Sequence, residues 1–174
     1  MRYLILLLVL FSACEVKVST GDDEKEKNKK TEKPGRNKNK IRNGIEIETI
    51  GGLKVDQAFL TYQDDGSFLD EENVTTINKP VKLNLVIKGW KGDDAQVSLD
   101  AEQKITTSEG DLLMHKKNML KDMKSISSKD AEYLSFEFVI TKLNKIFDYF
   151  LVEAHAWNTE YDQSVKASFK IHVE

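Results

Sequence analysis

Cysteine, proline and histidine are scarce in this chain, and long hydrophobic runs are missing. The 174 residues include one cysteine, two prolines and three histidines. A single cysteine excludes an intrachain disulfide, so a folded domain here depends on its hydrophobic core. A membrane-spanning helix needs about 20 consecutive apolar residues. The apolar stretch at residues 3–11 is too short for that, and no other stretch comes close.

Sequence motifs of the common catalytic chemistries are also missing. The chain has no Gly-x-Ser-x-Gly element for a serine nucleophile and no glycine-rich loop for phosphate. No pair of carboxylates stands out for glycoside hydrolysis. We therefore expect a protein that is not an enzyme and that needs no cofactor.

The charge is unevenly distributed along the chain. Residues 15–43 hold ten Lys and Arg against six Asp and Glu, a net charge of +4. Residues 44–174 hold fifteen against twenty-three, a net charge of −8. The whole chain carries −3 with a pI near 5.7, which gives no electrostatic reason to expect a nucleic-acid partner.

The first thirteen residues have the features of a secretory signal peptide. Arg2 supplies a positive charge, the apolar run at residues 3–11 follows, and small residues precede Cys14. The segment Phe11-Ser12-Ala13-Cys14 resembles the lipobox of bacterial lipoproteins. The resemblance implies cleavage before Cys14, a diacylglyceryl group on its thiol and usually an acyl chain such as palmitate on the new amino terminus. Two or more chains anchor a protein stably to a membrane.

Residues 14–43 are predicted to be the lipidated cysteine and a disordered, charged linker. After Val18 this segment has almost no large apolar side chains, so it cannot bury enough surface to offset the entropy of ordering. A flexible linker of this length has a reach of about 30 Å. We expect attachment to a bacterial envelope membrane, most simply the outer membrane, on either its periplasmic or its exterior side.

Residues 44–174 are predicted to form an all-β domain, because apolar and polar residues alternate with the period of a half-buried strand. Five segments show this pattern clearly: 45–48, 81–87, 134–141, 150–157 and 165–173. Further strands are expected near residues 57–62, 96–106 and 111–115. Turn sequences such as Asp65-Gly66 and Glu109-Gly110 separate them.

Seven to nine short antiparallel strands favour an immunoglobulin-like β-sandwich. A closed barrel of strands is the alternative. The spacing of Met119, Leu120 and Met123 predicts a short helical crossover over residues 117–125.

Metal binding has weak support in the sequence. The three histidines are His115, His155 and His172. His155 and His172 lie on different predicted strands, both on the side opposite the core. No acidic or cysteine spacing completes a zinc site around them. Weak calcium candidates lie in one acidic loop, which lacks the regular residue spacing of a calcium-binding loop. The alternative is that these acidic side chains only keep the loop hydrated. They are Asp64, Asp65 and Asp70, with Glu71 and Glu72 beside them.

The two tryptophans, Trp90 and Trp157, are the candidates for contact with a ligand or partner. Trp157 falls on the face of its predicted strand that carries Glu153 and His155, whereas Trp90 follows a strand at a turn. An exposed tryptophan can stack on a sugar or anchor a protein; the alternative is packing in the core. We expect an envelope lipoprotein that presents a β-sandwich to a protein partner. The alternative function is a carbohydrate or small-ligand binding module.

Overall fold

The computed structural model describes residues 40–123, 125–141 and 145–174. The signal peptide, Cys14 and most of the predicted linker lie outside these residues. In the described part, no helix has the length and apolar character needed to span a membrane.

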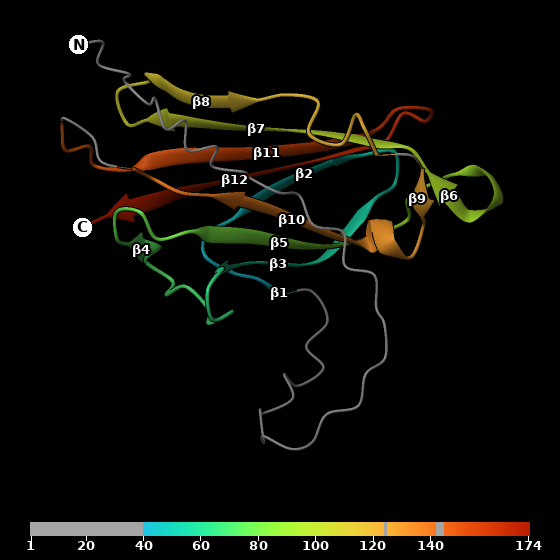
Figure 1. The fold of residues 1–174 in the computed structure, drawn as a ribbon. Helices are drawn as coiled ribbons and strands as arrows, with labels where there is room; N and C mark the ends of the chain where they lie inside the picture. The colour runs from blue at the N-terminus through green and yellow to red at the C-terminus, as the bar shows by residue number, and fades with distance from the viewer. Residues whose placement is uncertain (1–39, 124, 142–144) are drawn as a thin grey trace, which may run out of the picture.

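Two β-sheets face each other and form a sandwich (Figure 1). The first sheet has the order β1-β3-β5-β10, comprising Lys40–Ile41, Lys54–Tyr62, Val81–Lys88 and Tyr133–Phe138. The second has the order β2-β12-β11-β7-β8, comprising Glu46–Ile50, Ser164–Val173, Phe150–Asn158, Leu99–Thr107 and Leu112–Lys116. Val74–Thr75 (β4) pairs in parallel with β12 and makes this second sheet six-stranded. Gln96–Val97 (β6) and Ile126–Ser127 (β9) form a separate small ribbon.

The predicted all-β sandwich is confirmed. Eight of the described strands have five or more residues, and all pairings among these eight are antiparallel. Burial alternates residue by residue along β5, β10 and β11, which is the pattern predicted from their sequences. The immunoglobulin type of sandwich stays a prediction.

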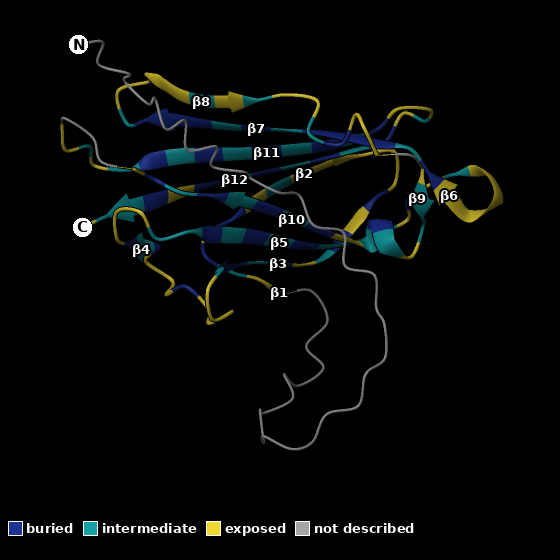
Figure 2. Cartoon of the chain, viewed as in Figure 1, coloured by how far each residue is buried: buried dark blue, intermediate teal, exposed yellow. Residues whose placement is uncertain are grey.

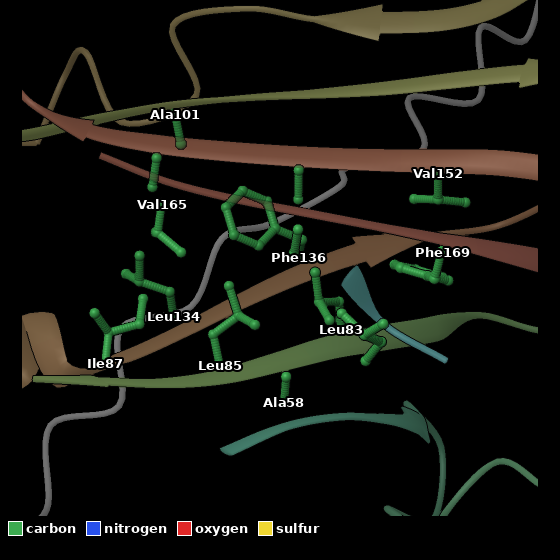
Figure 3. Close-up of a cluster of buried hydrophobic side chains, with 14 of the residues drawn as sticks. Ala58, Leu83, Leu85, Ile87, Ala101, Leu134, Phe136, Val152, Val165 and Phe169 are labelled. Atoms are coloured by element: carbon green, nitrogen blue, oxygen red, sulfur yellow. The ribbon is translucent and has the colours of Figure 1, made fainter. Parts of the chain in front are cut away.

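The core fills the space between the sheets (Figure 3). The first sheet contributes large side chains such as Leu60, Leu83 and Phe136, which are fully buried. The inner face of the second sheet carries a patch of small residues, namely Ala101, Ala154, Ala156 and Ala167. Large side chains opposite small ones let the two layers interdigitate at the density of a protein interior.

The predicted helix over residues 117–125 is wrong for the residues that the structure describes there. The described chain contains no α-helix, only two short 3₁₀ turns at Asp93–Ala95 and Asp130–Glu132. Asn118 has a left-handed backbone (φ 53°), which interrupts a helical path. The next two N–H groups donate to β7, from Met119 to the carbonyl of Ala101 and from Leu120 to the Asp100 carboxylate. The apolar spacing is satisfied by a turn that buries Leu120.

Strand structure is already present four residues ahead of the boundary predicted at residue 44. β1 pairs with β3 from Lys40 onward, and Asn43 is only 1% exposed. The Asn43 side-chain amide donates to Asn73 Oδ1 at 2.9 Å, and the Asn73 amide donates to the Asn43 carbonyl at 2.8 Å. Asn43 Oδ1 also accepts the N–H of Leu60, and Asn73 donates to the carbonyl of Lys170 in β12. This asparagine pair ties the start of the domain to both sheets.

Candidate ligand-binding face

Trp90 belongs to the core and is closed to a ligand. It is 8% exposed and packs in the main hydrophobic cluster. Its indole nitrogen is buried without a hydrogen-bond partner among the described residues. Of the two tryptophans singled out in the sequence, Trp157 therefore remains for surface contact.

Trp157 lies on the outer face of the six-stranded sheet, as the alternation predicts. It is half-buried on β11, where its paired neighbours are Ser164 on β12 and Asp100 on β7. The ring of His155, two residues earlier, lies 5.0 Å from the indole centroid at an interplanar angle of 39°. An aromatic surface formed by two rings thus lies beside polar side chains.

Beside this aromatic surface, Glu102 on β7 lies between two histidines. Its Oε2 is 3.0 Å from His115 Nε2, and its Oε1 is 3.4 Å from His155 Nδ1. The hydrogen bond to His115, followed by the one to His155, holds the pKa of Glu102 below its ordinary value, while partial burial opposes the shift. We name Glu102, His115, His155 and Trp157 the outer-face cluster.

Sequence reasoning missed Glu102 and did not connect it with the histidines. The connection comes from strand register, because Glu102 is paired with His155 across β7 and β11. His115 reaches Glu102 diagonally from β8, where its paired residue is Lys104. Such neighbours depend on which strands are adjacent in space, and one sequence does not show that.

A second charged network continues along the same face. Glu153 on β11 accepts from Lys166 at 3.0 Å and from Lys104 at 3.2 Å. Lys166 mainly, together with Lys104, lowers the pKa of Glu153 against the effect of burial, and Glu153 in turn raises the pKa of Lys166. Donors and acceptors therefore alternate across β7, β11 and β12.

The turn end of this face, where Trp157 lies, is held in place by Gln163. This side chain is 2% exposed and donates to the carbonyls of Gly51 and Gly89 at 3.0 and 2.8 Å. Its Oε1 accepts the N–H of Lys91 at 2.6 Å. A β-carbon on Gly51 would lie 2.1 Å from the Asp162 carbonyl, so glycine is required for this close approach. Three turns are thereby fixed around the start of β12.

His172 lies away from the other two histidines. Its Nδ1 is 2.7 Å from the carbonyl of Asp148, near the far end of β12. Across the described ranges, no three histidine, cysteine or acidic residues are grouped so that they could hold a metal ion.

The three weak calcium candidates serve two turns, one that contains Asp64 and Asp65 and one that follows Asp70. Asp65 accepts the N–H and the hydroxyl of Ser67, and these two bonds lower the pKa of its carboxyl. Asp64 accepts the N–H of Asp65, and Asp70 accepts the N–H of Val74. Glu71, beside them, binds the side chain of Arg42 instead. These bonds give each carboxylate a local structural role.

A shallow pocket opens where β2 and β4 both meet the edge of β12. Its volume is about 380 Å³, and Leu151, Ser168 and Phe169 contribute to its lining. The asparagine pair and the acidic Glu46, Glu71 and Glu72 complete the pocket together with Gly44, Lys170 and His172. Leu151 and Trp157 are six residues apart on β11, which places the pocket about 20 Å from the indole.

No family model matches this chain, and no curated protein matches it. Among solved structures, the chain is similar to a crystal structure of the C-terminal domain of Wzt. The sequences are 15% identical, the match covers 78% of this chain and 81% of that chain, and the TM-score is 0.47. These values describe a distant likeness.

Proposed function

We propose that this chain is a lipid-anchored binding protein of a bacterial envelope and that its sandwich domain binds a carbohydrate at the outer-face cluster. The anchor is supported by the lipobox-like sequence that ends at Cys14. The composition of the charged segment after it predicts a flexible linker with a reach of about 30 Å. The domain acts by binding and performs no catalysis.

The single observation that carries the carbohydrate proposal is the setting of Trp157. The flat face of an indole ring is an apolar surface against which the C–H groups of a sugar ring can pack. Polar groups around the indole can form hydrogen bonds with the sugar hydroxyls. Glu102 supplies acceptors, Lys166 supplies donors, and the imidazole of His155 supplies either. Charged side chains are depleted in the cores of protein–protein interfaces, so this polar face suits a polyhydroxylated ligand better than a protein.

Glycan-array screening of the mature chain, followed by tryptophan fluorescence titration with the best glycan, tests this proposal. Trp157→Ala should abolish the fluorescence change and lower the affinity at least tenfold, because the stacking surface is lost. Tyr133→Ala is the matched control, since Tyr133 is an aromatic residue 48% exposed on the other sheet. Equal binding by parent and Trp157→Ala would refute the proposal.

A protein partner is the second candidate, and exposed leucines on β8 favour it. Leu112 is 57% exposed and Leu113 is 41% exposed, and both lie on β8, the strand at one edge of the six-stranded sheet. An open strand edge with apolar side chains can take up a strand from another chain. A photoreactive residue in place of Leu113 should give a crosslinked adduct in intact cells. The same residue in place of Ser135, on β10 of the other sheet, should not. Absence of any adduct from position 113 would exclude this candidate.

A further inference from the structure

We propose that the carbohydrate site extends from Trp157 along β11 and β12 to the shallow pocket beside Leu151, and that its ligand is a linear oligosaccharide of several sugar units without acidic groups. This inference rests on the proposed function, because it assumes that a sugar stacks on Trp157. It adds the length, the direction and the charge of the glycan.

The pocket and Trp157 lie on the same face of the six-stranded sheet. Leu151 lines the pocket and lies six residues before Trp157 on β11, and side chains an even number of residues apart on a strand share a face. On β12, Ser164 is paired with Trp157 and Lys170 is paired with Leu151. Buried and partly exposed residues alternate along β11 and the first part of β12 (Figure 2). We name the surface between these two pairs the outer strip.

The length of the outer strip sets the length of the ligand. The six residues from Leu151 to Trp157 span about 20 Å, at about 3.3 Å per residue. A single sugar ring on the indole does not reach that far, whereas a chain of several linked rings does. A ligand that occupies both the indole and the pocket is therefore an oligosaccharide that runs parallel to β11 and β12.

Hydroxyl groups are available along the outer strip. Ser164 and Ser168 on β12 are partly exposed, and their hydroxyls form no hydrogen bond with any residue that the structure describes. The lysines that alternate with them are engaged elsewhere, because Lys166 binds a carboxylate on β11 at 3.0 Å and the Lys170 ammonium lies 4.3 Å from the centre of the Tyr149 ring. A serine hydroxyl both donates and accepts, so Ser164 and Ser168 can bind the hydroxyls of a sugar chain.

The charge of the pocket wall disfavours acidic glycans. The charged and titratable side chains that line the pocket are Glu46, Glu71, Glu72, Lys170 and His172. Glu46 and Glu72 form no ion pair with a described residue. The carboxylates or phosphates of an acidic glycan would be repelled here, and the net charge of −8 on residues 44–174 adds to the repulsion. The hydroxyls of a neutral sugar can instead donate to these carboxylates.

Calorimetric titration of the mature chain with sugars of two lengths tests the inference. The probes are linear oligosaccharides of glucose, galactose, mannose and N-acetylglucosamine, each as the disaccharide and as the hexasaccharide, with alginate hexasaccharide as the acidic counterpart. We expect a neutral hexasaccharide to bind at least tenfold more tightly than its own disaccharide, and alginate hexasaccharide to bind more weakly than either.

A variant that fills the outer strip separates a long site from repeated binding at Trp157. A hexasaccharide offers the indole several overlapping positions, which raises the apparent affinity without a second contact. Ser168 is paired with Glu153, so it lies about 13 Å from the level of Trp157 along the strands. Ser168→Tyr should remove the gain of the hexasaccharide and leave the affinity for the disaccharide unchanged. Ser135→Tyr, the same change on the other sheet, should alter neither affinity.

Lys170→Ala is the second variant and decides the result if Ser168→Tyr fails to fold, because Lys170 is exposed. It should weaken hexasaccharide binding at least threefold and leave the disaccharide unaffected. Equal affinity of the parent for both lengths, or a hexasaccharide gain that survives these variants, would overturn the long site while leaving sugar binding at Trp157 intact. Preference for alginate hexasaccharide would overturn the exclusion of acidic glycans. Binding of no probe, or unchanged binding of both lengths by Trp157→Ala, would overturn the carbohydrate proposal itself.

Discussion

Replacing Phe138 by alanine removes a ring that contacts both sheets. Phe138 on β10 is 1% exposed, and its ring centroid lies 5.8 Å from that of Phe169 on β12. Truncation of a fully buried phenylalanine costs about 3–5 kcal/mol, from lost transfer free energy and from the cavity that remains. A typical domain is stable by about 5–15 kcal/mol, so the folded fraction should fall severely.

Chemical denaturation of the variant and its parent, with the same denaturant slope for both, gives the difference in unfolding free energy. Glu137→Ala is the control, since Glu137 is the next residue, faces outward and is paired with Lys82 on β5. Loss of a surface interaction there should cost no more than about 1 kcal/mol. Equal losses in the two variants would refute the assignment of β10 as a half-buried strand, because neighbouring side chains of a strand face opposite sides.

Three further predictions concern the anchor, the domain boundary and the charged face. Cys14→Ala should abolish metabolic palmitate labelling and release the domain from the membrane fraction; an unlabelled parent would contradict the anchor. A fragment that begins at residue 44 should be at least about 2 kcal/mol less stable to denaturant than one that begins at residue 40, because loss of Asn43 leaves the Leu60 N–H and Asn73 Oδ1 without partners. Since the folded pKa of Glu153 is lowered, its contribution to stability is present above its unfolded pKa and lost as pH falls through the folded pKa. Glu153→Gln should therefore have a lower free energy of unfolding than the parent near pH 7, and a similar one once pH falls below the folded pKa. Denaturation experiments at both pH values measure this, and the same difference at both would argue against this ion pair.

Strand content and facing could be predicted because each depends on neighbours close in sequence. The alternation around Val81–Ile87 and Phe150–Ala156 matches their burial residue for residue. The helix predicted from Met119, Leu120 and Met123 was wrong because a three-residue apolar spacing also fits a turn that buries one residue. There, hydrogen bonds to β7 replaced the helical bonds.

Of the candidate site, the sequence indicated Trp157 and the outward direction of His155. Glu102 and His115 could not be joined to them, since their contact depends on β7 lying between β8 and β11. The same limit hid the role of Asn43, which looks like part of a charged linker in sequence but is buried against Asn73 thirty residues later.

The sequence by itself determined that residues beyond the charged segment form strands, which side of each strand is buried, and where a lipid anchor is expected. These properties follow from local periodicity and composition. Only the tertiary structure decided that Trp90 is closed off, that Glu102 lies between two histidines, and that β8 is left at an open edge. Each of these results from the order and register of strands that are distant in the chain, which long-range packing selects.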